Sequence, residues 1–93
     1  MNRKIKAAWV AALKSNKFSQ TTNTLYDRNS YCCLGVLCQI QDPKNLCPWR
    51  YEGNPPRSLR AGLTLEDINI LVEANDAQRW KFWQIAEFVD ATL

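Results

Sequence analysis

Histidine is absent from the 93-residue sequence, and with it the commonest general base and metal-binding side chain in proteins. Catalytic schemes built on Ser-His or Cys-His pairs are therefore excluded, as are most zinc hydrolase sites. Paired carboxylates are few. Glu66 with Asp67 suits a helix cap, and Glu87 with Asp90 suits an exposed helix edge. The sequence therefore favours a protein without enzymatic activity.

Glycine is also scarce, and none of the three residues falls in a phosphate-binding motif. Gly35, Gly53 and Gly62 stand alone, which fits neither GxGxxG nor GxxxxGK and excludes nucleotide hydrolysis by those routes. Long apolar runs are missing as well, since no stretch approaches the roughly 18 apolar residues of a membrane span. The run AAWVAAL near the start is too short for a secretory signal. We therefore expect no membrane association and a cytoplasmic location.

The composition that remains is that of an ordinary globular protein. Apolar residues make up 46% and charged residues 23%, which excludes a disordered chain. The length suits one small domain covering residues 1–93. The net charge of +3 is too small to imply a nucleic-acid partner, but residues 1–60 carry ten basic and three acidic side chains, against two and six in residues 61–93. This asymmetry indicates either an anionic partner or attraction between the two parts on folding.

Apolar periodicity predicts a mainly α, compact domain of four helices. Asn2 is the expected N-cap of the first helix, and Thr64 with Asp67 resembles a capping box for the third. Asn75-Asp76 is expected to end the third helix. The segment LYDRNSY, residues 25–31, suits a tight reversal that closes a small two-stranded β-ribbon. The expected helices span residues 3–15, 32–40, from about 65 onward, and 81–91.

The second helix is expected at the centre of the domain, because CCLGVLCQI is apolar on nearly every face. Glycine destabilises a helix relative to alanine, so the presence of Gly35 inside this cysteine-rich helix predicts the close approach of another helix there. Side chains of the first and last helices complete the core. The expected core residues are Trp9, Cys32, Cys33, Gly35, Leu37, Cys38 and Ile85.

The four cysteines leave disulfides, a metal site or buried thiols open. Within one helix, Cys33 and Cys38 lie roughly 7.5 Å apart, beyond disulfide reach, so only a bridge to Cys47 or a strained vicinal one remains. Their side chains point about 140° apart around the helix axis, so the two cysteines cannot bind the same metal ion. Reduced, buried thiols are therefore expected, with no metal and no cofactor. A reactive thiolate at Cys32 or Cys33, near the helix start, remains an alternative.

The segment PWRYEGNPPRSLR, residues 48–60, combines aromatic and basic side chains in a long irregular loop, and such loops are often functional. Tryptophan and tyrosine anchor protein partners or stack on bases, and arginine binds phosphates or carboxylates with two hydrogen bonds. The alternative is that the aromatic rings complete a small core. The candidate binding residues are Trp49, Arg50, Tyr51, Arg57 and Arg60, together with Trp80 from the RWKFW segment.

Four motifs occur in order along the chain: a Trp-x-x-Ala-Leu helix at Trp9, YCCLGVLC at 31–38, Asn75-Asp76, and FWQIAEFV near the end. Together they resemble a family of small proteins commonly encoded by tailed bacteriophages, and the CCLGVLC string is the specific part. The chain departs from the family at residues 59–63, where many members carry Trp-Leu-Gly-Leu. The resemblance implies a phage accessory protein acting in the host cytoplasm, and it supplies no biochemical activity.

The leading functional prediction is a non-enzymatic binding module that engages a host or phage macromolecule, with a protein favoured as the partner. The second is a nucleic-acid or nucleotide binder. The third is a small cysteine-dependent enzyme or redox protein. Self-association stays open, because the last helix has a broad apolar face. The second prediction uses one basic face formed by Arg3, Lys4, Lys6, Arg50, Arg57 and Arg60.

Overall fold

The computed structural model describes residues 1–93 and shows a mainly α fold with one small sheet, as the sequence predicts. The loop after α2 contains two 3₁₀ turns, and a π-helical segment continues α3. The helices are α1 (Arg3–Lys14), α2 (Cys33–Gln41), α3 (Leu65–Val72) and α4 (Phe82–Thr92). The strands are β1 (Ser19–Gln20), β2 (Tyr26–Asp27) and β3 (Ser30–Tyr31). The shorter helical segments are η1 (Trp49–Tyr51), η2 (Arg57–Leu59) and the π-helical η3 (Glu73–Ala77).

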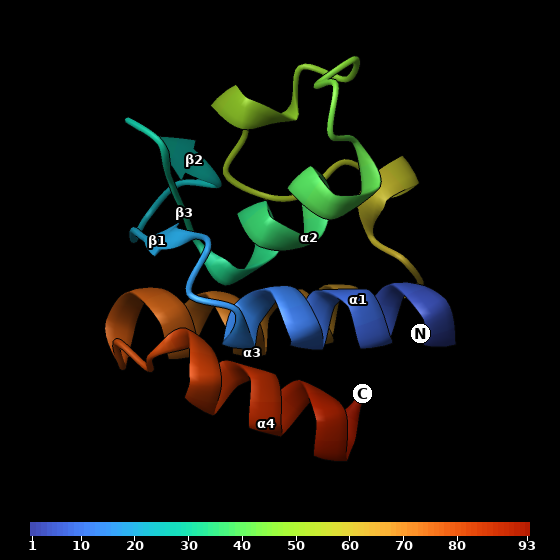
Figure 1. Cartoon of the computed structure of the whole chain (residues 1–93), viewed down its shortest axis with the longest axis vertical. Coiled ribbons are helices and arrows are strands. Elements are labelled where there is room, and N and C mark those ends of the chain that lie inside the picture. The colour runs from blue at the N-terminus through green and yellow to red at the C-terminus, as the bar shows by residue number, and fades with distance from the viewer.

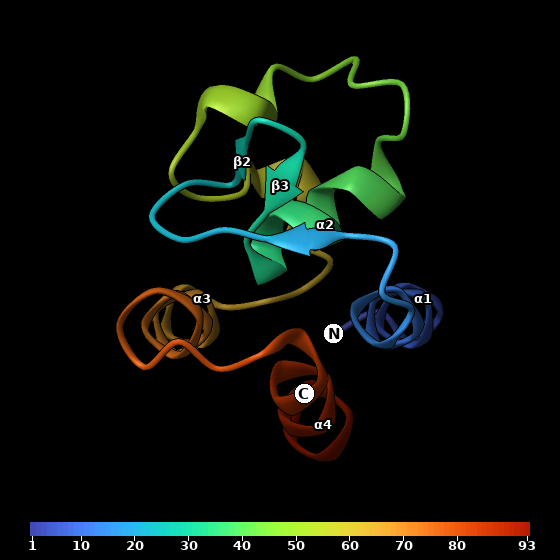
Figure 2. The same cartoon turned by 60° about the vertical axis from the view of Figure 1, so that its left-hand side comes forward.

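The helices are arranged in layers. Figure 2 shows α1 and α3 nearly end-on, on opposite sides of the molecule, with α4 on one side of this pair and α2 with the sheet on the other. The loop that contains η1 and η2 arches over the side of α2 that faces away from α1 (Figure 1). Helix α1 packs against both α2 and α4, and α2 also packs against α3. No helix is both long enough and apolar enough to cross a membrane.

The side chains of α2 are buried from Cys33 through Cys38 and belong to the hydrophobic core. All seven residues that the sequence assigned to the core are buried. Trp9 connects α1 to this helix, because its indole N–H donates a hydrogen bond to the carbonyl oxygen of Cys33 at 2.9 Å. A buried tryptophan needs such a partner for its single donor.

The close approach at Gly35 comes from a loop, not from the neighbouring helix that the sequence suggested. A Cβ at Gly35 would lie 2.9 Å from the carbonyl carbon of Leu25 and closer still to its oxygen. The same oxygen accepts a hydrogen bond from the backbone N–H of Cys32 at 3.3 Å. The segment before β2 is therefore pressed onto the first turn of α2, and only glycine leaves room for it.

Both predicted N-caps are present. The side chain of Asn2 accepts a hydrogen bond from the backbone N–H of Ile5 at 3.0 Å. The Thr64 hydroxyl accepts from the N–H of Asp67 at 3.1 Å, and the Asp67 carboxylate accepts from the N–H of Thr64 at 3.0 Å. These reciprocal bonds satisfy donors that the first turn of α3 would otherwise leave unpaired.

The sheet has three strands where the sequence suggested a two-stranded ribbon. β3 is central and pairs antiparallel with β2, with Tyr26 opposite Tyr31. It also pairs in parallel with β1, with Ser19 opposite Ser30. The added strand brings the chain after α1 across the molecule toward the start of α4, where the principal cavity lies.

The Asn75-Asp76 pair does not end the third helix as expected. The helix widens into the π-helical η3, in which the N–H of Gln78 donates to the carbonyl oxygen of Glu73 at 2.9 Å. The reversal comes after this segment, at Arg79, whose φ of 56° lies in the left-handed region. Because of the extra length, the side chain of Asn75 is buried instead of lying in a surface turn.

Candidate functional site

The loop of residues 43–62 does not present its aromatic residues together. Trp49 has an exposed fraction of 0%, and its indole N–H donates to the Asp42 carboxylate at 3.0 Å. Tyr51, two residues later, is 92% exposed. The expectation that Trp49 belongs to a binding surface is therefore wrong, because its ring fills the core beneath the loop. The alternative that the loop aromatics complete a core holds for Trp49 alone.

Two of the three arginines in this loop support its structure. The guanidinium carbon of Arg50 lies 4.2 Å from the centre of the Tyr26 ring, which is a cation–π contact. The Nε of Arg60 donates to a backbone carbonyl within the loop at 3.0 Å, whereas Arg57 is exposed. These arginines do not line the loop's own cavity of about 110 Å³. That cavity is lined by Cys47, Pro48, Trp49, Glu52 and Pro56.

Asp42 holds the loop against the end of α2. Its carboxylate accepts hydrogen bonds from the backbone N–H groups of Leu46 at 2.9 Å and Cys47 at 3.0 Å, in addition to the indole of Trp49. Partial burial raises the pKa of this carboxyl, but the three hydrogen bonds together outweigh it and hold the pKa below its ordinary value. The group is a structural anchor for the loop.

The thiols of α2 are buried and protonated. Burial raises the pKa of Cys32 to about 11 and that of Cys38 to about 12, and it raises the pKa of Cys33 well above its ordinary value. The Sγ of Cys32 instead caps α2 by accepting from the N–H of Gly35 at 3.4 Å. A thiolate nucleophile therefore finds no support here. All four cysteines are unpaired, and no three metal-binding side chains come together.

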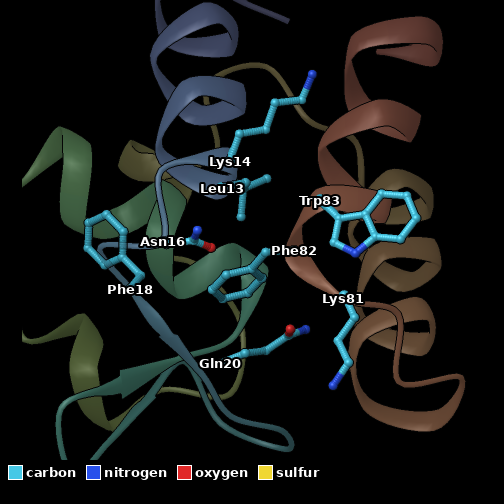
Figure 3. A pocket seen from close by; sticks show the side chains of 8 residues that line it. All are labelled: Leu13, Lys14, Asn16, Phe18, Gln20, Lys81, Phe82 and Trp83. Carbon is cyan, nitrogen blue, oxygen red and sulfur yellow. The ribbon is translucent and has the colours of Figure 1, made fainter.

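The principal cavity is a cleft of about 490 Å³ between the end of α1, strand β1 and the start of α4. Its size lies within the usual range for ligand sites, roughly 300–1,000 Å³. Figure 3 shows Trp83 on one side of it and Phe18 on the other, with Lys14 and Lys81 toward its two ends. We call it the α1–α4 cleft. Its lining residues are Leu13, Lys14, Asn16, Phe18, Gln20, Lys81, Phe82 and Trp83.

A second cavity adjoins this cleft and is lined by polar and charged residues. It has a volume of about 180 Å³, and no apolar residue lines it. Gln20 and Lys81 line both cavities, so the two adjoin at these side chains. We call the second cavity the polar pocket. Its lining residues are Gln20, Thr22, Asn75, Arg79 and Lys81.

The buried side chain of Asn75 lines the polar pocket and fixes the position of Gln20. Its Oδ1 accepts hydrogen bonds from the backbone N–H of Cys33 at 3.2 Å and from Nε2 of Gln20 at 2.9 Å. Its Nδ2 donates to the carbonyl oxygen of Thr21 at 2.9 Å and to the carboxylate of Asp76 at 2.8 Å. One amide thus connects α2, β1 and η3, and all four of its bonding positions are used.

Gln20 is held in one orientation by this network. Its Nε2 donates to Asn75 and also to the carbonyl oxygen of Trp80 at 2.7 Å, which uses both of its protons. The Oε1 of the same amide is the atom that remains to meet a ligand. Gln20 therefore offers an acceptor at the junction of the two cavities.

The electrostatic character of both cavities is positive. Lys14, Arg79 and Lys81 are exposed, and no acidic residue lines either cavity. Lys81 is the N-cap residue of α4, where the helix dipole disfavours a cation. The helix itself gains nothing from a lysine at this position. The linings contain no thiol, carboxylate or imidazole, and their three cations are suited to binding an anionic group.

Sequence reasoning found the RWKFW segment and named Trp80, whereas the tryptophan that lines the α1–α4 cleft is Trp83. Trp80 is half-buried and packs edge-on against Phe88, with ring centres 6.1 Å apart. Trp83 is 56% exposed and lines the α1–α4 cleft. Sequence reasoning missed four residues of the cleft: Lys14, Phe18, Gln20 and Lys81. Lys81 could have been noticed, because the helix dipole disfavours a cation at the start of a helix. Because the cavity joins segments far apart in the chain, periodicity alone does not identify it.

Comparison with known proteins gives one match. Residues 1–60 match the model of a family described as a domain of unknown function, DUF8296. No curated protein and no solved structure matches the chain. The matched residues include α1, the sheet, α2 and the loop through η2, whereas α4 lies outside them.

Proposed function

The chain belongs to the DUF8296 family, and we propose that it is a non-enzymatic binding protein whose recognition site is the α1–α4 cleft with its polar pocket. The observation that carries this proposal is the lining of the two cavities. An exposed tryptophan and three cations surround them, without an acidic side chain or a thiol. Such a lining suits a ligand that is anionic at one end and flat or apolar at the other.

The site is preformed, which favours recognition without a large ordering cost. Asn75 holds the β1 segment to η3 and to the start of α2, and Gln20 is fixed by two hydrogen bonds. In this proposal the cysteine-rich α2 is the structural centre. Its buried thiols fill the core and position the neighbouring elements, while recognition is left to peripheral side chains.

We further propose that the ligand is a host or phage macromolecule met in the host cytoplasm. The resemblance of YCCLGVLC and its companion motifs to small phage proteins supports this setting. The loop of residues 43–62 takes a secondary part at most, since Trp49 is buried and Arg50 and Arg60 serve the loop itself.

Affinity capture from bacterial lysate tests the proposal. The cleft variant combines Lys81→Glu with Trp83→Ala, and its matched control combines Arg57→Glu with Tyr51→Ala, which changes one exposed cation and one exposed aromatic in the other loop. We expect a component that the wild type and the control retain and that the cleft variant loses. Treating the lysate with nuclease or with protease identifies its class. Equal capture by the two variants would contradict the proposed site.

A further inference from the structure

The α1–α4 cleft and the polar pocket differ in the types of residue that line them, and this difference indicates which ligand they suit. Four apolar side chains line the first cavity, whereas the second has none. Gln20 and Lys81 stand at the junction and line both. The other four residues that line the cleft are polar or charged, so a ligand that suits both cavities carries a flat ring with polar edges, joined to an anionic, hydrogen-bonding part.

We propose that this paired site binds a nucleotide unit, meaning a base that carries a phosphate, presented by single-stranded nucleic acid or as a free nucleotide. The inference rests on the proposed function and names the ligand class for the same site. It assigns the base to the α1–α4 cleft and the phosphate to the polar pocket.

Trp83 and Gln20 supply the contacts expected for a base. The Trp83 ring is 56% exposed and lies across the cleft from Phe18 (Figure 3), so its surface is available for stacking. The free Oε1 of Gln20 accepts from an exocyclic amino or ring N–H group, and each of the common bases presents one on its pairing edge. Stacking on a single ring tolerates different bases, and preference among them would depend on this one acceptor.

Arg79, Lys81 and Thr22 supply the contacts expected for a phosphate. Arginine binds phosphate with a planar fork of donors, and lysine acts as a compact charge beside it. Arg79 is held in the left-handed region at the end of η3, a conformation that arginine rarely adopts. Asp76 accepts a hydrogen bond from Nδ2 of Asn75 and does not itself line the pocket. Lys14, at the opposite end of the cleft, is placed for a neighbouring phosphate of a strand.

The geometry favours a single strand over a duplex and over an acidic peptide. A paired base is stacked inside a duplex and cannot enter a cleft whose deep side is formed by the buried Leu13 and Phe82. An acidic peptide would pair with the cations, but its Asp and Glu side chains carry no flat ring to stack on the exposed ring of Trp83.

Fluorescence polarisation of a labelled dodecathymidylate at low salt tests the inference, with thymidine monophosphate, the matching duplex and a polyglutamate peptide as competitors. We expect the single strand to bind with a log–log salt slope of about −2, given three cations at roughly 0.7 each. Trp83→Ala should weaken binding about five- to 150-fold and leave the slope unchanged. Lys81→Gln should reduce the slope by about 0.7. Tyr51→Ala and Arg57→Gln should bind like the wild type.

The competitors separate the two sources of the nucleotide unit. Competition by the monophosphate indicates that a free nucleotide suffices, and competition by an unlabelled strand alone indicates that the chain of phosphates is required; either outcome supports the inference. No binding, equal binding by Trp83→Ala and the controls, or displacement by polyglutamate alone would overturn it. If lysate capture still depends on the cleft in that case, the proposed function stands and only the ligand class is wrong. A circular dichroism melt of each variant verifies that it is folded.

Discussion

Oδ1 of Asn75 accepts a hydrogen bond from the backbone N–H of Cys33 at 3.2 Å, although the two residues are 42 positions apart in the sequence. The bond links the π-helical η3 to the first turn of α2. Through Gln20, the same side chain also positions the junction of the two cavities. The packing of the core and the shape of the candidate site therefore depend on one buried amide.

Replacing Asn75 with alanine should destabilise the protein by roughly 2–4 kcal/mol, because buried donors and acceptors would lose their partners. Urea denaturation followed by circular dichroism measures the free energy of unfolding. Asn69→Ala, at an exposed position of α3, is the matched control and should change it by no more than about 0.5 kcal/mol. A loss of the same small size in both variants would show that the Asn75 network is not a structural anchor.

The same residue shows where prediction from the sequence ends. The caps at Asn2 and Thr64 were predictable because each donor and acceptor lies within three residues of its partner. Asn75 has the ordinary signal of a turn, and its real partners at Gln20 and Cys33 lie in other segments. A local pattern carries no information about those contacts. The mainly α class was therefore accessible from the sequence, and the wall of the site was not.

The aromatic residues show the same limit of prediction from the sequence. Trp49 and Tyr51 are two residues apart in one loop, yet the first is fully buried and the second almost fully exposed. In the same way the sequence named Trp80, whereas Trp83 is the more exposed of the two rings and Trp80 packs edge-on against Phe88. Residue type predicted that aromatic rings would matter in both segments. Which ring faces solvent depends on packing between elements that the sequence does not specify locally.

Gly35→Ala should destabilise the protein by roughly 1–3 kcal/mol, because the added methyl group would overlap the backbone carbonyl of Leu25. A backbone group cannot rotate away as a flexible side chain can. Gly53→Ala is the matched control, since a Cβ there meets nothing within 4 Å, and its stability should change by about 0.5 kcal/mol or less. Equal thermal midpoints for both variants would contradict the close approach.

The free energy of unfolding should decrease at acidic pH, because protonation weakens the hydrogen bonds that the Asp42 carboxylate accepts from the loop. The pKa of its carboxyl is lowered in the folded state, so protonation favours the unfolded chain. The contribution is fully present above the unfolded value of 3.8 and is lost as the pH falls through the lower, folded pKa. Urea midpoints measured from neutral pH down to about pH 2.5 should show a gap between wild type and Asp42→Asn that closes only below pH 3.8. A constant gap would contradict the assignment.

The thiols should fall into two kinetic classes when the folded protein is treated with a thiol reagent near neutral pH. With pKa values of about 11 and 12, Cys32 and Cys38 expose almost no thiolate, and fully buried Cys33 is inaccessible as well. Cys47 is only partly buried, and it should react first. We therefore expect one fast equivalent of released chromophore and three that appear only when urea is added. Cys47→Ser removes the fast equivalent and serves as the control. Rapid reaction of more than one thiol in that experiment would place a nucleophile at the surface and reopen a catalytic role for α2.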